Sequence, residues 1–179
     1  MSIKSFLLFL FLGGLSSLQA QEIGLTLQQY PTGTIPGATF TLPVGNQNAL
    51  QLRVGYNIVY HGDAGVWDNE EGGGFGFSPA WFHSFKEDRS GLYIGGRLDI
   101  WFNVIDWADN IGAANEINGM TDIVVVQPTA IIGYRLNLGD KLVLTPELAV
   151  GAEINAIQDG EDVGQGAILL MGITLARRF

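Results

Sequence analysis

The chain has 179 residues, enough for one domain of ordinary size, and its net charge of −9 disfavours nucleic acid as a partner. It contains no cysteine, which excludes disulfides and a lipid anchor attached through cysteine. Hydrophobic residues make up 47% of the chain and charged residues only 15%, yet after Gln21 no apolar stretch approaches the ~20 residues of a transmembrane helix.

Residues 1–20 differ from the rest of the chain. Lys4 forms a short positive segment, residues 6–12 are continuously apolar, and Ala20 is a small residue at the expected cleavage position. This layout is typical of a secretory signal peptide, because the apolar run is well short of the ~20 residues that an N-terminal membrane anchor needs. We therefore expect a signal peptide at 1–20 and an exported domain at 21–179.

The rest of the chain alternates between apolar and polar residues with a period of two, which indicates β-strands. Between residues 49 and 60, for example, the even positions from Leu50 to Tyr60 are apolar, whereas Arg53 stands on the odd face. Eight alternating segments lie at 23–27, 38–44, 49–60, 75–85, 91–105, 122–138, 141–157 and 169–179. The pattern predicts an all-β fold of eight antiparallel strands.

The predicted connections alternate between long and short. The longer ones fall at 30–37, 61–74, 106–121 and 158–165, and the shorter ones at 45–48, 86–90 and 139–141. An up-and-down barrel with both termini on the periplasmic side has short turns there and longer loops outside. Because the apolar residues are even-numbered on both sides of 139–141, the turn must have an odd length. We expect three residues, one of them in the left-handed region.

Pro128 and Pro146 fall inside predicted strands, where each removes one ladder hydrogen bond. We therefore expect local bulges at both positions. The alternative is that one of these strands is wrongly assigned.

Charged residues of both signs occupy the polar face of the predicted strands: Arg53, Arg97, Asp99, Arg135, Glu147 and Glu153. The interior of an eight-stranded barrel is just wide enough for side chains to fill. We therefore expect a charge network in the lumen, in which Glu147 contacts Arg97 or Arg135 and Asp99 joins them, while the apolar face meets lipid. The alternative is a soluble, lipocalin-like barrel with the two faces reversed.

The C-terminal strand ends on an aromatic residue, Phe179, and residues 160–170 carry a Gly-Glu-Asp-Val-Gly-Gln-Gly stretch before a new apolar run. With the signal peptide and the eight alternating segments, the chain resembles the OmpA/OmpX-like outer-membrane β-barrel domains over residues 22–179. The resemblance implies an eight-stranded up-and-down transmembrane barrel in the outer membrane of a Gram-negative bacterium. It also implies outer-membrane lipid and the barrel assembly machinery as partners, a monomer, and Phe179 as the assembly signal. Arg177 departs from this signal, because its position is usually apolar.

Residues that could carry catalysis or bind a cofactor or metal are sparse. Neither His61 nor His83 has a serine nucleophile in strand register beside it, and the glycines at 72–74 lack the lysine of a phosphate-binding loop. We therefore expect no enzymatic activity and no cofactor. The three longer loops at 61–74, 106–121 and 158–165 carry Asp and Glu but no Lys or Arg, which keeps them soluble or, alternatively, lets them bind divalent cations.

These observations predict a non-enzymatic integral outer-membrane barrel with a structural or surface-interaction role, a lumen plugged by charged side chains and acidic extracellular loops. One alternative is a narrow conduit for small hydrophobic molecules with a lateral opening near the long loops. Trp101, Ile105 and Val125, on the inward register near the outer end, favour that alternative weakly. A membrane-embedded lipid-modifying enzyme is disfavoured because a catalytic cluster is missing.

Overall fold

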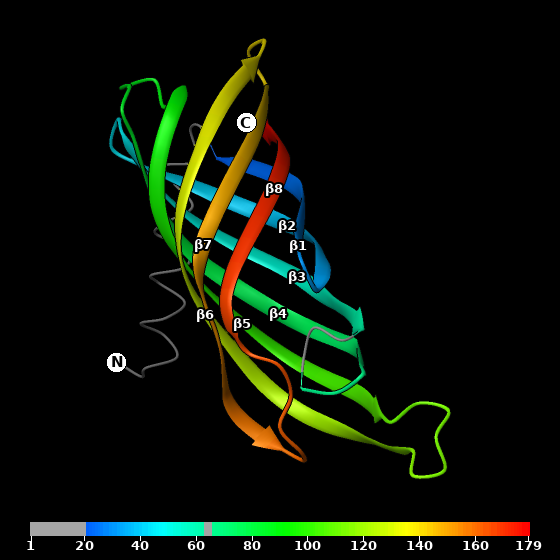
Figure 1. Cartoon of the computed structure of the whole chain (residues 1–179). Helices are drawn as coiled ribbons and strands as arrows, with labels where there is room; N and C mark the ends of the chain where they lie inside the picture. The colour runs from blue at the N-terminus through cyan, green and yellow to red at the C-terminus, as the bar shows by residue number, and fades with distance from the viewer. Residues whose placement is uncertain (1–20, 63–65) are drawn as a thin grey trace, which may run out of the picture.

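The computed structural model describes residues 21–62 and 66–179, so the predicted signal peptide at 1–20 lies outside the described residues. The described chain forms eight antiparallel strands that pair in sequence order and close into a barrel (Figure 1). The strands are β1 (Glu22–Tyr30), β2 (Gly33–Val44), β3 (Asn48–Gly62), β4 (Asn69–Ser84), β5 (Gly91–Asp109), β6 (Ile117–Leu138), β7 (Leu142–Asp159) and β8 (Gly166–Arg178). The predicted fold class and strand order are confirmed.

Within the described residues, no α-helix has the length and hydropathy needed to cross a bilayer.

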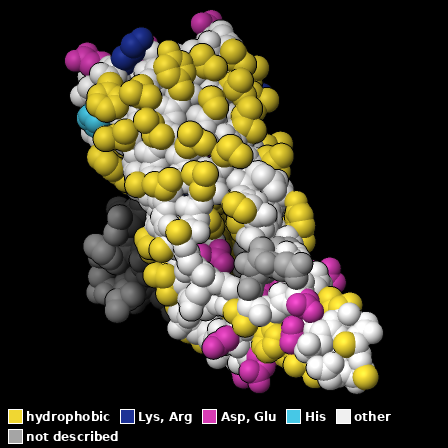
Figure 2. Space-filling model, viewed as in Figure 1, with side chains coloured by type: hydrophobic (Ala, Val, Ile, Leu, Met, Phe, Trp, Pro, Cys, Tyr) yellow, Lys and Arg dark blue, Asp and Glu magenta, His cyan; other side chains and the backbone are white. Residues whose placement is uncertain are grey.

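Apolar side chains cover the outer wall of the barrel, as the period-two pattern predicts. On β3, Leu52 is 47% exposed and the adjacent Arg53 only 1%, and the same alternation runs along the other strands. Figure 2 shows apolar side chains spread over the upper part of the visible surface and most of the acidic side chains at the lower end. The reversed arrangement of a soluble barrel is therefore excluded for this structure.

The first connection is much shorter than predicted. β1 continues to Tyr30 and β2 begins at Gly33, so only residues 31 and 32 join them, where the sequence predicted a loop at 30–37. Ile35 is fully buried and continues the inward register that the Pro and Gly residues of this segment conceal. The other outer connections are also shorter than predicted, because their strands continue beyond the ends of the alternating segments that the sequence showed.

The prediction of bulges at Pro128 and Pro146 is wrong, because the strand register does not shift at either residue. Pro128 pairs with Leu98 of β5, and the register between β6 and β7 is the same before and after it. Pro146 pairs with Ile173 of β8 without a shift. A proline lacks only its own backbone N–H, so one ladder hydrogen bond is lost, to the strand on one side. The strand therefore needs no extra residue there. The register shift lies instead between Val124 and Val125 of β6.

The turns at the other end follow the predictions more closely. Leu138 pairs with Leu142, so β6 and β7 are joined by three residues, and Gly139 has a φ of +75° in the left-handed region. In the turn between β4 and β5, the backbone N–H and the hydroxyl of Ser90 donate hydrogen bonds to Asp88, which lowers the pKa of that carboxyl.

Replacing Leu98 with arginine tests whether the outer wall lies in hydrocarbon. Leu98 is 39% exposed on the middle of β5 and faces outward. An arginine at the bilayer midplane costs about 2–4 kcal/mol, so Leu98→Arg is expected to lower the free energy of unfolding in phospholipid vesicles by that amount. Glu87→Arg, in the exposed turn between β4 and β5, is the control and should leave stability unchanged. Equal stability of both variants would place the apolar wall outside the membrane.

Candidate functional site

The predicted lumen charges meet at the centre of the barrel. Nη2 of Arg53, on β3, lies 2.6 Å from Oδ1 of Asp99, on β5. Nε and Nη2 of Arg53 also donate to the hydroxyl of Ser78 at 3.1 Å, and Nη1 donates to Oε1 of Gln28. Every nitrogen of this guanidinium therefore has an acceptor, as a fully buried cation requires.

A second arginine extends the network across the lumen. Nε of Arg97 lies 3.0 Å from Oδ1 of Asp99, and its Nη1 lies 2.7 Å from Oε1 of Glu147 on β7. Glu147 also accepts hydrogen bonds from Nε2 of Gln28 at 2.6 Å and from the hydroxyl of Tyr93 at 3.0 Å. We call this set the charge layer: Arg53, Arg97, Asp99 and Glu147, with the neutral side chains of Gln28, Ser78 and Tyr93. Its two positive and two negative groups balance.

Arg135 lies outside the charge layer and pairs elsewhere. Its Nη2 lies 2.7 Å from Oε1 of Glu22, the first residue of β1, and Nε of Arg178 lies 3.1 Å from the same oxygen. Sequence reasoning missed Glu22 and Arg178. They are the first residue of β1 and the last residue of β8, and they pair where β1 closes against β8. Extending the alternation of β1 back from Ile23 by one residue would have placed Glu22 on the inward face.

Glu153 does not join the charge layer either, so its predicted place in that network is wrong. Its carboxylate accepts a hydrogen bond from Nε2 of Gln127, and Oε1 of Gln127 accepts one from Nε1 of Trp101 at 3.1 Å. Glu153 stands six residues beyond Glu147 on β7, which at ~3.3 Å per residue places it ~20 Å further along the strand. That separation leaves it beyond the reach of Arg53 and Arg97.

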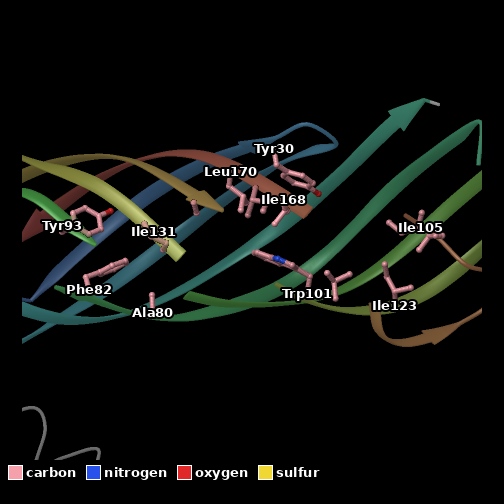
Figure 3. Close-up of a cluster of buried hydrophobic side chains, with 14 residues drawn as sticks. Tyr30, Ala80, Phe82, Tyr93, Trp101, Ile105, Ile123, Ile131, Ile168 and Leu170 are labelled. Atoms are coloured by element: carbon pink, nitrogen blue, oxygen red, sulfur yellow. The ribbon is translucent and has the colours of Figure 1, made fainter. Parts of the chain in front are cut away.

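Aromatic rings flank the charge layer on both sides. The guanidinium of Arg53 lies 5.3 Å from the ring centre of Trp101, which has no exposed surface. On the other side, Phe82 and Tyr93 meet edge to face with their ring centres 5.1 Å apart. Figure 3 shows Trp101 near Tyr30, Ile168 and Leu170, and Phe82 and Tyr93 in a separate group with Ala80 and Ile131. The charges are therefore enclosed by apolar side chains rather than by solvent.

The apolar residues proposed to line a conduit lie in the barrel interior. Trp101, Ile105 and Val125 point inward, as predicted, but all three are buried in the same apolar cluster.

A second group of contacts lies at the outer mouth of the barrel. Oε1 of Glu70, on β4, accepts the backbone N–H groups of Val66 and Trp67 at 2.7 and 3.2 Å, and Oε2 accepts that of Gly164 at 3.1 Å. These bonds link the connection between β7 and β8 to the connection between β3 and β4. The side chain of Val163 is buried next to them.

Two tryptophans add to the contacts between these loops. The rings of Trp67 and Trp107 are stacked with their centres 4.3 Å apart, and Nε1 of Trp67 donates to the carbonyl oxygen of Asp162 at 2.7 Å. We call Trp67, Glu70, Trp107 and Val163 the mouth cluster. Sequence reasoning treated this region as solvated acidic loop and missed it, although two tryptophans beside acidic residues were an available signal.

Two acidic residues of the described loop segments contact the loop backbone. Among residues 21–62 and 66–179, no three His, Asp or Glu side chains gather closely enough to hold a metal ion. Instead, Glu116 accepts the backbone N–H of Gly112 at 2.8 Å, and Asp68 accepts that of Ile111 at 3.4 Å. These carboxylates order the loop backbone.

His83 lies on the outer wall near the turn end of β4. Its Nδ1 is 3.1 Å from Oδ1 of Asn48, and its ring neighbours those of Trp81 and Phe85, whose centres lie 6.2 and 5.9 Å away. The side chain of His83 therefore faces outward among aromatic rings. His83 is thus placed as a wall residue, and the side chain of His61 lies outside the described residues.

Phe179 directly follows β8 and is 61% exposed. Its backbone N–H donates to the carbonyl oxygen of Gln21 at 2.9 Å, and the guanidinium of Arg177 lies 5.1 Å from the centre of its ring. Arg177 therefore stacks on the aromatic residue whose signal it departs from. The role of Phe179 in assembly stays a prediction.

Comparison with solved structures bears on the fold. The surface protein NspA from Neisseria matches 89% of this chain and 95% of its own with a TM-score of 0.52 and 10% identity. Ail, the attachment invasion locus protein of Yersinia pestis, matches 89% of this chain and 97% of its own with a TM-score of 0.50 and 8% identity. The N-terminal β-barrel domain of Pseudomonas aeruginosa OprF has a TM-score of 0.49 and 12% identity over 90% of this chain and 98% of its own. No protein-family model and no curated protein matches the chain. At these identities, the chain shares with NspA and Ail its fold.

Removing Glu147 tests the energetic importance of the charge layer. In Glu147→Ala, Arg97 loses its partner across the lumen and the hydroxyl of Tyr93 loses its acceptor. Breaking a buried ion pair costs about 3–5 kcal/mol, so the free energy of unfolding, measured by urea denaturation in vesicles, is expected to fall by that amount. Glu71→Ala removes an exposed carboxylate from β4 and serves as the control. A loss of stability no larger than that of the control would show that the ion pair between Arg97 and Glu147 does not stabilise the barrel.

Removing Glu70 tests whether its carboxylate holds the loop backbone at the outer mouth. In Glu70→Ala the backbone amides of Val66, Trp67 and Gly164 lose a charged acceptor. Because a hydrogen bond to a charged group contributes about 1.5–3 kcal/mol, their hydrogen exchange is expected to accelerate by about tenfold or more. Glu71→Ala should leave these rates as they are in the wild type. Unchanged exchange in Glu70→Ala would show that the loops are held by other contacts.

Proposed function

We propose that the chain is an integral outer-membrane β-barrel whose lumen is closed and whose role is structural or surface-interactive. The outward apolar residues and the inward polar residues support this assignment, because a closed barrel is the form in which strands can satisfy their backbone in lipid. The partner along the wall is then outer-membrane lipid. Phe179, exposed after the last strand, suits recognition by the barrel assembly machinery.

The charge layer is the observation that carries this proposal. The side chains of Arg53, Arg97, Asp99 and Glu147 are between 0 and 7% exposed, and each has a partner of opposite charge at 2.6–3.0 Å. An ion that crossed the lumen would have to separate these pairs in a region of low dielectric constant, which costs several kcal/mol per charge. A barrel closed in this way serves as a scaffold, and its interactions are made by its ends.

The outer end favours cationic partners over anionic ones. The connections at 66–68, 110–116 and 160–165 contain Asp and Glu but no Lys or Arg, whereas Lys86, Arg89 and Lys141 lie at the opposite end. The Ail structure was solved in complex with the heparin analogue sucrose octasulfate, which is a polyanion. Charge repulsion would disfavour such a ligand at the acidic loops of this chain.

Conductance measurements test the closed lumen. The wild-type protein in planar lipid bilayers is expected to show no steady channel current, because the charge layer fills the cross-section. The double variant Arg53→Ala with Asp99→Ala removes both members of the central pair and leaves neither charge alone, so a measurable current is expected. Glu71→Ala, at the exposed end of β4, should behave like the wild type. A steady current through the folded wild type would contradict the proposal.

A further inference from the structure

The barrel wall has a notch at its outer end, because the hairpin of β1 and β2 is short. On one side, β8 begins at Gly166, but its first residue paired with β1 is Met171, opposite Gln29, so within the described chain residues 166–170 pair only with β7. On the other side, Val59 is the last residue of β3 paired with β2, opposite Gly33, and beyond it β3 pairs only with β4. Figure 1 shows the β1–β2 hairpin ending well short of β3 and β4.

The notch opens into a pocket of about 410 Å³. The hairpin tip, Tyr30 to Thr32, forms one side, residues 162–168 form the other, and Glu153 lies between them. The side chains of Tyr30, Val163 and Ile168 are themselves buried and give the pocket apolar walls. The hollow faces the viewer in Figure 2, where an acidic side chain is visible inside it.

Glu153 brings an uncompensated negative charge to this pocket. The inward-facing carboxylates of Glu22, Asp99 and Glu147 are each paired with an arginine, and that of Glu70 accepts three backbone N–H groups. Among the described residues, no Lys or Arg forms an ion pair with Glu153, and its hydrogen-bond partner, Gln127, is neutral. Because Gln127 is itself bonded to Trp101, the carboxylate is held in place by a fixed donor rather than left to rotate.

We propose that this pocket binds an organic ammonium ion with a short apolar body, which enters sideways through the notch. The ammonium group would pair with Glu153, because a half-buried carboxylate is stabilised by an opposite charge. The apolar body would lie against Val163 and Ile168, and the ring of Tyr30 offers a face that attracts cations. A single carboxylate in apolar surroundings suits a monovalent organic cation better than a divalent metal, which requires several oxygen ligands.

The pocket is a binding site rather than the entrance to a conduit. The hydroxyl of Tyr30 donates to Oδ1 of Asn57 at 2.7 Å, and both side chains are buried beneath the pocket. Two residues earlier on β1, Gln28 donates a hydrogen bond to Glu147 of the charge layer. The lumen below the pocket is therefore closed by polar contacts.

Binding of three small molecules of similar shape tests the proposal. The probes are 2-phenylethylammonium, the neutral 2-phenylethanol and the anionic phenylacetate, titrated calorimetrically into the full chain in lipid nanodiscs. Empty nanodiscs correct for partitioning into lipid. The ammonium probe is expected to bind the wild type at least about tenfold more tightly than the alcohol, a difference of about 1.4 kcal/mol, and phenylacetate more weakly than either.

Two variants assign the effect to Glu153. Glu153→Gln keeps the size of the side chain and removes its charge, so the preference for the ammonium probe over the alcohol should be lost. Asp159→Asn removes an exposed carboxylate six residues further along β7, outside the pocket, and should preserve that preference. Equal binding of the ammonium probe and the alcohol by the wild type would overturn the proposal, as would undiminished ammonium binding by Glu153→Gln.

A third variant covers the case in which Glu153→Gln does not fold, which heat-dependent migration on gels detects. Ala167 is exposed at the rim of the pocket, so Ala167→Trp should obstruct the notch while leaving Glu153 in place. This variant is expected to lose binding of both the ammonium probe and the alcohol. Ammonium binding that survives in folded Ala167→Trp would overturn the location of the site.

Discussion

The ion pair between Arg53 and Asp99 is the interaction on which the rest of the structure depends. An eight-stranded barrel has room inside for side chains but little else, so a charge that points inward must find its partner there. The partners of this pair come from different strands, and a shift of one residue in any of them would turn a charged group outward. The pair therefore couples the register of β3 to that of β5, and through Arg97 and Glu147 to that of β7.

The apolar outer wall is the counterpart of this charged interior. A surface as apolar as that of β3 is stable only where it is removed from water, and the closed pairing of β1 with β8 leaves no long strand edge within that wall. The balance of charges inside and the apolar band outside thus require each other. The ends of the barrel are free of both constraints, and there the mouth cluster and the notch give the molecule its individual features.

The alternation of side chains predicted the strands and their faces, because these depend on residues close in sequence. Estimated heights along the strands suggested that Glu147 contacts Arg97 or Arg135 but left the partner open, and in the structure that partner is Arg97. The same reasoning failed where the alternation was interrupted or polar on both faces. Proline and glycine hid the inward register around Ile35, and the outer ends of β5 and β6 were assigned to a loop.

The sequence by itself determined which side chains face lipid and which face the lumen, because that alternation is a local property of an extended chain. It also determined that the turn at Gly139 has an odd number of residues, because the two flanking strands have the same parity. Only the tertiary structure decided that Arg135 pairs with Glu22, that Glu153 stands apart from the arginines, and that a short first hairpin leaves a notch in the wall. These features depend on the tilt, stagger and relative lengths of strands that are distant in sequence, and those quantities are set only when all eight strands close into a barrel.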